Sequence, residues 1–131
     1  MKSNIQILST KKLTTLQRNL FKPKLTIIER DFVKIEWINI YKNEFKYCPS
    51  KVIFTSQNAV KSILKSFSRN ELTFDEIYCV GEKTKKFLEI NNFEVTHFEH
   101  YGKDLANYII NQKNIKEITF FCLFIRLAEF P

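Results

Sequence analysis

Three short segments combine hydroxyl, amide and lysine side chains at points where a strand is expected to lead into a helix. They are residues 55–58 (Thr-Ser-Gln-Asn), 81–84 (Gly-Glu-Lys-Thr) and 101–103 (Tyr-Gly-Lys). Because ligands of parallel α/β sheets bind outside the carboxyl ends of the strands, the three segments are predicted to share one rim. Helix N-termini have unpaired N–H donors and a partial positive charge, so this rim favours carboxylates or phosphates.

Each segment also has an explanation that needs no ligand. Ser56 fits an ordinary N-cap, since serine is preferred there for stability alone. Thr84 fits a first-turn residue of a helix. Both explanations stay open for each residue taken singly, whereas the combination on one rim favours a ligand.

The sequence lacks the motifs of common nucleotide-binding, nucleophilic and metal-binding sites. The sequence has no G-x-G-x-x-G, G-x-x-x-x-G-K-[ST], G-x-S-x-G or C-x-x-C motif, and it contains only two glycines. His97 and His100 would point to opposite faces of a strand, and a metal site needs further ligands, so no metal is predicted.

The composition limits the class of protein. With 131 residues, 44% of them hydrophobic, the chain suffices for one packed domain but not for two complete ones. No apolar run is long enough to span a bilayer and no signal peptide is evident, so a soluble cytoplasmic protein is expected. The net charge of +7 favours nucleic acid, acidic lipid or a polycarboxylate as partner, although lysines scattered on helix faces fit a solvated surface equally well.

The cysteines support a reducing compartment. Cys48, Cys79 and Cys122 are odd in number and far apart, which argues against a disulfide framework. Cys79 and Cys122 lie in apolar runs and are expected to behave as small hydrophobic residues.

Strands and helices alternate along the chain in a way that would position the three segments. Apolar periodicity predicts a mainly parallel α/β sheet. Asn91 and Asn92 are expected to end a helix, because asparagine tolerates the left-handed conformation. The predicted strands are residues 5–9, 25–28, 51–55, 77–80, 93–98 and 117–122, and the predicted helices cover 11–21, the region of 60–67, the residues after 81, and 104–110.

Residues 25–40 are predicted to hold a strand pair joined end to end. Arg30 and Asp31 interrupt the apolar character of this segment. Residues 25–28 would close one sheet, residues 33–37 would begin a second body, and the polar segment 39–50 would lead into the next strand.

Several of these segments resemble known motifs. Residues 52–60 resemble the F-T-S-x-x-A-V segment of uroporphyrinogen-III synthases, and residues 78–84 are similar to that family's V-G-x-x-T turn. Residues 102–106 match its G-x-x-L-A-like entry to the next helix, and residues 120–131 resemble its C-G-N-x-R-x-x-L-P region. The order and spacing of these motifs over residues 5–131 carry the resemblance.

The resemblance implies two α/β lobes joined by a two-stranded connector. Residues 1–28 would be the first βαβ segment of an incomplete lobe, 29–32 the connector, and 33–131 a nearly complete second lobe whose last helix is cut short. The expected fold class is therefore α/β, with a flavodoxin-like or Rossmann-like parallel sheet. Family members are longer, so the resemblance implies a truncated chain without most of the first lobe.

The resemblance also implies a cofactor-free lyase of tetrapyrrole (haem) biosynthesis. Such enzymes cyclise hydroxymethylbilane to uroporphyrinogen III with inversion of the D ring, mainly by holding the substrate in a suitable conformation. The catalytic residues stay unassigned, and the chain alone is expected to be weakly active or inactive. The implied contacts to substrate acetates and propionates come from Thr55, Ser56, Gly81, Thr84, Gly102, Lys11, Lys83 and Lys103.

Residues 120–125 form an uninterrupted apolar run where the family has a polar turn. Leu123 and Phe124 stand at the positions of a small residue and an asparagine. Such a run is expected to be covered by the rest of the chain or by a second copy, which would give a homodimer.

Two other functions fit the sequence less well. A non-catalytic α/β domain could bind anions or nucleic acid through its lysines, and nucleic-acid binding would then fall steeply with salt. No helix interleaves lysines with aromatic residues in one stripe, which disfavours nucleic acid. A receiver-like or flavodoxin-like interaction domain is the other alternative, but no acidic cluster of the receiver type follows the strands.

Overall fold

The chain divides into two units, Met1–Trp37 and Ile38–Pro131. The computed structural model describes residues 5–21, 25–37 and 49–122. The predicted lobes and connector stay a prediction, since a division into units does not identify a connector.

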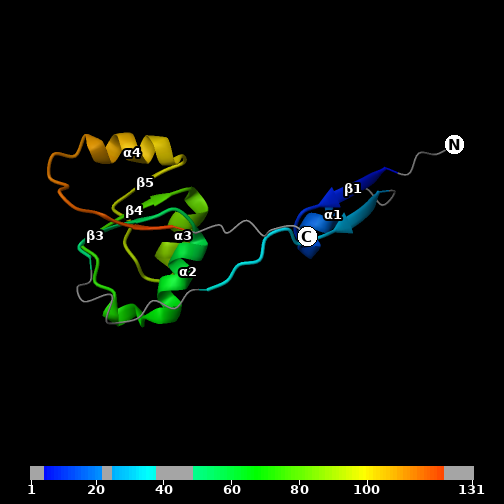
Figure 1. Cartoon of the computed structure of the whole chain (residues 1–131), viewed down its shortest axis with the longest axis horizontal. Coiled ribbons are helices and arrows are strands. Elements are labelled where there is room, and N and C mark those ends of the chain that lie inside the picture. The colour runs from blue at the N-terminus through cyan, green and yellow to red at the C-terminus, as the bar shows by residue number, and fades with distance from the viewer. Residues whose placement is uncertain (1–4, 22–24, 38–48, 123–131) are drawn as a thin grey trace, which may run out of the picture. The chain divides into compact units, whose positions relative to one another are not determined.

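The first unit is a parallel βαβ segment. β1 (Gln6–Ser9) pairs with β2 (Thr26–Glu29), and α1 (Thr15–Asn19) lies between them in sequence (Figure 1). Register partners Leu8 and Ile28 are both exposed. A two-stranded sheet is marginally stable in water, and residues 5–21 and 25–37 include no buried side chain, so this described part of the unit forms no core.

The helix of the first unit is shorter than the sequence predicts. Leucine spacing indicated a helix over residues 11–21, but α1 begins only after Thr14, which forms a capping box with Gln17. Leu16 and Leu20 are 80% and 84% exposed, so they do not face a core as expected. The helix itself is confirmed, but its predicted bounds were too long, because a short helix without a packed apolar face is only marginally stable in water.

The second unit contains a four-stranded, wholly parallel sheet in the order β5-β4-β3-β6. The prediction of a parallel α/β fold is therefore confirmed. The central strands are β3 (Lys51–Phe54) and β4 (Glu76–Val80), and the edge strands are β5 (His97–Glu99) and β6 (Thr119–Phe121).

Helices cover the two faces of this sheet. α2 (Gln57–Ser66) and α3 (Glu82–Ile90) pack against each other on one face, and α4 (Gly102–Ile110) packs on the other (Figure 1). Right-handed crossovers explain this arrangement, because the strand order runs outward from β3 to β5 and then returns past β3 to β6. A 3-10 helix, Arg69–Glu71, follows α2.

Two apolar cores result from strand alternation. Val52 and Phe54 belong to the core beneath α2 and α3, whereas Ile53 belongs to the core beneath α4. The Phe54 ring stacks on the Phe121 ring with centroids 5.0 Å apart, which joins β3 to β6 through side chains as well as backbone.

Several predicted strands end differently in the structure. Residues 33–37 contain no strand, so the prediction of a strand there was wrong, and residues 38–48 lie outside the described part of the chain. The strand predicted over 93–98 is confined to β5, because Asn92 has a positive φ of 61° and Phe93 packs into the core instead.

The cysteines differ in environment. Cys79 is buried, and desolvation raises the pKa of its thiol to about 12, which makes it an inert hydrophobic residue as predicted. Cys122 is exposed, contrary to expectation, and it lies just outside β6, which ends at Phe121. Cys48 lies outside the described residues.

Candidate anion-binding site

The strand order of the second unit reverses between β3 and β6. The connection after β3 passes through α2 on one face of the sheet, whereas the connection that leads into β6 passes through α4 on the other face. In doubly wound folds, ligands bind outside the carboxyl ends of the strands near such a reversal of strand order. The α2 turn (residues 55–58) follows β3 at this point. The α3 turn (residues 81–84) follows the adjacent strand β4.

The α2 turn presents two hydroxyls. The Ser56 hydroxyl accepts a hydrogen bond from the Ala59 N–H at 3.1 Å, so Ser56 is the N-cap of α2. Its O–H remains able to donate to another group. The Thr55 N–H donates to the Phe121 carbonyl at 3.4 Å, whereas its hydroxyl has no hydrogen-bond partner among residues 49–122.

The α3 turn depends on a glycine. Gly81 has φ = 85°, and its N–H donates to the Glu99 carbonyl at 2.8 Å. The turn closes through the Thr84 N–H, which donates to the Gly81 carbonyl at 3.1 Å. Thr84 is only 5% exposed, yet its hydroxyl has no hydrogen-bond partner in the described part of the chain.

One side-chain hydrogen bond joins these two turns. The Gln57 Nε2 donates to the Lys83 carbonyl at 2.9 Å. The structure therefore brings the predicted Thr55, Ser56 and Thr84 to neighbouring, linked turns. Gln57 was not predicted as a site residue, because a sequence does not indicate which group the side-chain amide at a helix start will contact.

The α4 turn (residues 101–103) is separate from the other two. Tyr101, Gly102 and Lys103 are exposed, and a Cβ added at Gly102 would meet no atom within 4 Å. Among the described residues, no hydrogen bond connects this turn to the α2 or α3 turn. Gly102 thus has open space around it, and the shared use of all three turns stays a prediction.

The lysines of α3 differ in whether they form ion pairs with neighbouring glutamates. Lys86 pairs with Glu82 at 2.7 Å, and this hydrogen bond lowers the pKa of the Glu82 carboxyl. Lys85 lies 3.8 Å from Glu89 and also over the Phe98 ring. Lys83 has no ion pair with any described residue and is exposed, so its charge is available at the α3 turn.

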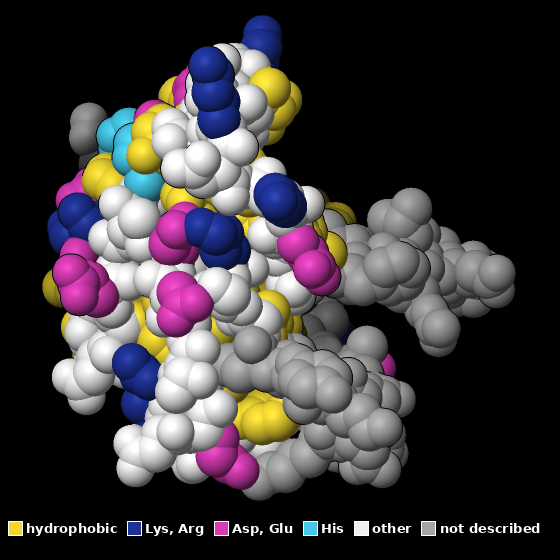
Figure 2. Space-filling view, turned by 90° about the vertical axis from the view of Figure 1, so that its left-hand side faces the viewer, with side chains coloured by type: hydrophobic (Ala, Val, Ile, Leu, Met, Phe, Trp, Pro, Cys, Tyr) yellow, Lys and Arg dark blue, Asp and Glu magenta, His cyan; other side chains and the backbone are white. Residues whose placement is uncertain are grey.

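Basic and acidic side chains are interspersed on one face of the molecule (Figure 2). No continuous basic patch is visible on this face. Nucleic-acid binding proteins gather their lysines and arginines on one face or along one helix, so this surface gives no support for that alternative.

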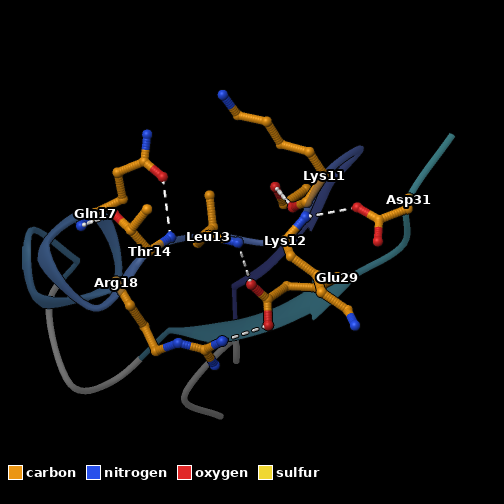
Figure 3. Close-up of polar contacts among 9 residues, drawn as sticks. Lys11, Lys12, Leu13, Thr14, Gln17, Arg18, Glu29 and Asp31 are labelled. Carbon is orange, nitrogen blue, oxygen red and sulfur yellow. Dashed lines mark hydrogen bonds and ion pairs between the residues drawn. The ribbon is translucent and has the colours of Figure 1, made fainter. Parts of the chain in front are cut away.

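Lys11 belongs to a loop in which the N–H groups of the next three residues are hydrogen-bonded (Figure 3). The Glu29 carboxylate accepts from the Leu13 N–H at 2.6 Å, and the Asp31 carboxylate accepts from the Lys12 N–H at 2.9 Å. The Leu13 hydrogen bond, with the nearby Arg18, lowers the pKa of the Glu29 carboxyl. Figure 3 shows the Lys11 side chain extending away from both carboxylates.

The two histidines have apolar and ionic neighbours. The His97 ring stacks on Tyr108 with centroids 3.6 Å apart, and its Nε2 lies 2.9 Å from Glu99 Oε1. His100 meets the Phe98 ring edge-on. Among the described residues, no group of three or more His, Cys, Asp or Glu side chains could hold a metal ion.

The family of the chain follows from its middle and C-terminal regions. The family model for uroporphyrinogen-III synthase HemD matches residues 35–124. The chain belongs to this family. The matched residues include the four strands of the second unit and all three turns, and they exclude Lys11. No curated protein and no solved structure matched the chain.

Membership of the uroporphyrinogen-III synthase family confirms the resemblance and supports a related function in tetrapyrrole biosynthesis. It assigns no role to individual residues, so the substrate contacts predicted from sequence stay a prediction. The described helices are all too short or too polar to cross a lipid bilayer.

Proposed function

We propose that this chain is a uroporphyrinogen-III synthase-type protein that binds hydroxymethylbilane through the α2 and α3 turns. The reaction of this class is a lyase reaction, in which the substrate loses its terminal hydroxyl and closes into a macrocycle with inversion of the D ring. The family match over residues 35–124 supports this class of function.

The unpartnered hydroxyl of Thr84 is the observation that carries the proposal. Among the described residues, Arg69 Nε is the only fully buried side-chain nitrogen or oxygen without a hydrogen-bond partner, so the Thr84 hydroxyl oxygen is not cut off from solvent and a ligand can reach it. Thr84 is 5% exposed and lies in the first turn of α3, and its N–H already donates to the Gly81 carbonyl at 3.1 Å. Its hydroxyl is therefore the donor that a substrate carboxylate would use.

The charge and geometry of the two turns suit a polycarboxylate. Thr55 and Ser56 offer O–H donors on the α2 turn, and Thr84 offers one on the α3 turn. Lys83 adds an unpaired positive charge, and Lys11 and Lys103 are proposed as further carboxylate partners. Several weak contacts to one ligand bind it more tightly than any single contact.

Catalysis in this proposal consists mainly of positioning. Binding several side arms at fixed points holds the two ends of the linear tetrapyrrole close together, which lowers the entropic part of the barrier to ring closure. The donors remain hydrogen-bonded to carboxylates that do not react. No residue is assigned as a general acid or base.

We propose that the chain alone cyclises its substrate weakly or not at all. The first unit lacks buried residues in its described part, and Leu8 and Ile28 are exposed on its sheet. A parallel sheet normally has both faces covered, so this unit is a poor platform for one side of a substrate site.

The test uses freshly generated hydroxymethylbilane and separation of the uroporphyrinogen isomers. Spontaneous closure gives the type I isomer, so an excess of type III over a protein-free control measures activity. Binding of uroporphyrin, a stable polycarboxylate, is measured in parallel by fluorescence titration. We expect binding with little or no type III excess; absence of both binding and type III product contradicts the proposed function.

A homodimer through the apolar C-terminal segment also stays a proposal. β6 lies at the edge of the sheet, and Phe120 is 55% exposed there. Exposed apolar edge strands invite pairing with another chain. Light scattering tests the proposal, and a monodisperse monomer would count against it.

A further inference from the structure

The α2 and α3 turns meet through a single directional contact. Gln57 is the first residue of α2, and its amide donates to the Lys83 carbonyl at 2.9 Å. No other hydrogen bond joins the two turns in the described part of the chain. The remaining contacts between α2 and α3 near this end include Lys61 over the Phe87 ring, at 5.3 Å from the centroid.

The acceptor of this bond belongs to the peptide group that leads into Thr84. A peptide group is planar, so the Lys83 carbonyl and the Thr84 N–H move together. The Thr84 N–H donates to the Gly81 carbonyl at 3.1 Å. This peptide is therefore held at both ends, by Gln57 at its oxygen and by Gly81 at its N–H.

Apolar packing alone would not fix this peptide. Contacts between side chains of α2 and α3 are non-directional and roughly proportional to buried area. A hydrogen bond instead weakens steeply when its distance or angle departs from the optimum. Gln57 thus adds a directional restraint between the α2 turn and the α3 turn to the non-directional contacts of the shared core.

We propose that Gln57 is a positioning residue that fixes the spacing between the donors of the α2 turn and Thr84. This inference rests on the proposed function, and it adds that the two turns act as a pair toward ligands that carry several carboxylates. A ligand that spans both turns depends on their spacing, whereas a ligand with one carboxylate does not. Gln57 itself touches no substrate in this account.

Replacement of Gln57 by methionine tests the proposal. Methionine has a similar length and no N–H donor, so Gln57→Met removes the contact to the Lys83 carbonyl. We expect uroporphyrin affinity to fall roughly three- to tenfold, the range of one neutral hydrogen bond. Acetate affinity should change by less than about twofold, because acetate engages one turn at a time.

Gln112→Met is the matched control. Gln112 follows α4 and is hydrogen-bonded through its backbone: its N–H donates to the Ile109 carbonyl, and its carbonyl accepts from the Ile115 N–H. The side chain can therefore change without breaking either bond. The control should leave affinity for both ligands unchanged. In nitrogen-15 NMR spectra of the free protein, the Thr84 amide resonance should shift in the Gln57 variant and not in the control.

The possible failures are distinguishable. A wild-type protein that does not bind uroporphyrin overturns the proposed function and, with it, this inference. A wild type that binds, together with a Gln57→Met variant of equal affinity and unshifted Thr84 amide, overturns the inference alone. Unfolding in urea should be unaffected, because the bond is exposed, so a variant that loses affinity by unfolding also contradicts the proposal.

Discussion

The loop after β1 and the turns after β3 and β4 occupy equivalent places in parallel βα units. They differ in whether their hydrogen-bond donors already have partners within the protein. In the first unit, Glu29 and Asp31 bind the backbone N–H groups of the loop. In the second unit, Thr55 and Thr84 keep hydroxyls without partners among residues 49–122. In the first unit the Lys12 and Leu13 N–H groups are thus occupied by carboxylates of the same unit. In the second unit the two hydroxyls are the donors that we propose bind a substrate carboxylate.

The two units also differ in what holds them together. The second has two apolar cores, whereas the first relies on polar contacts around Glu29 and on the Thr14 capping box. A loop whose N–H groups bind carboxylates of the same unit can stabilise a short segment. The same N–H groups are then not available to a ligand. The comparison therefore supports the proposal that the second unit, whose described residues form two apolar cores, binds the ligand.

Removal of an apolar side chain should change the free energy of unfolding far more in the second unit than in the first. Ile63 is fully buried beneath α2, so Ile63→Ala should lower the free energy of unfolding by about 2–5 kcal/mol. Leu16, on α1, is 80% exposed, so Leu16→Ala should change it by less than about 0.5 kcal/mol. Urea unfolding measures both, and similar losses would contradict the view that the first unit lacks a core.

The two glycines of the second unit provide the next test. Gly81 has φ = 85°, so Gly81→Ala should destabilise the protein by about 1–3 kcal/mol. Gly102 has open space and no positive φ, so Gly102→Ala should be neutral or stabilise by about 0.4–1 kcal/mol. Thermal unfolding distinguishes these signs, and an unstrained Gly81→Ala would remove the stated reason for glycine in the α3 turn.

Acid should open the loop of the first unit. The pKa of the Glu29 carboxyl lies below its ordinary value of 4.5, chiefly because the carboxylate accepts a hydrogen bond from the Leu13 N–H. Its contribution to stability is therefore present above pH 4.5 and is lost as the pH falls through the lowered pKa. The Leu13 amide shift, followed by NMR, should stay constant near neutrality and titrate below pH 4.5. Glu29→Gln should abolish that titration, and a midpoint at or above 4.5 would refute the assignment.

The smallest expected effect compares two lysines of α3. Lys83 is unpaired among the described residues, whereas Lys86 pairs with Glu82 at 2.7 Å. Lys83→Met should weaken uroporphyrin binding about two- to fivefold and reduce its salt dependence, while Lys86→Met should leave binding nearly unchanged. Titrations at low and high salt measure both, and equal effects would mean that charge near the α3 turn acts without specificity.

The sequence predicted most of the second unit, because there periodicity and burial agree. Val60 and Ile63 recur at helical spacing and are buried under the sheet, and Asn92 adopts the left-handed conformation expected after a helix. In the first unit the same reasoning failed for Leu16 and Leu20, since a pattern of leucines does not say whether a partner layer is present.

The candidate site was predictable in position but not in detail. Parallel strands that are followed by hydroxyl-rich turns place Thr55 and Thr84 at the same edge of a sheet from sequence alone. Which donors are already satisfied depends on contacts between distant residues, such as Leu13 with Glu29 and Gln57 with Lys83. Those contacts carry no sequence periodicity, so only the folded structure reveals them.

Replacement of Thr84 by valine, measured for both stability and ligand affinity, tests the central claim most directly. Valine keeps the shape and removes the hydroxyl. We predict that Thr84→Val leaves the free energy of unfolding unchanged or higher, because the lost hydroxyl had no partner, and that uroporphyrin affinity falls about ten- to hundredfold, as for a hydrogen bond to a charged group. A variant that is less stable and binds as tightly as the wild type would contradict the account.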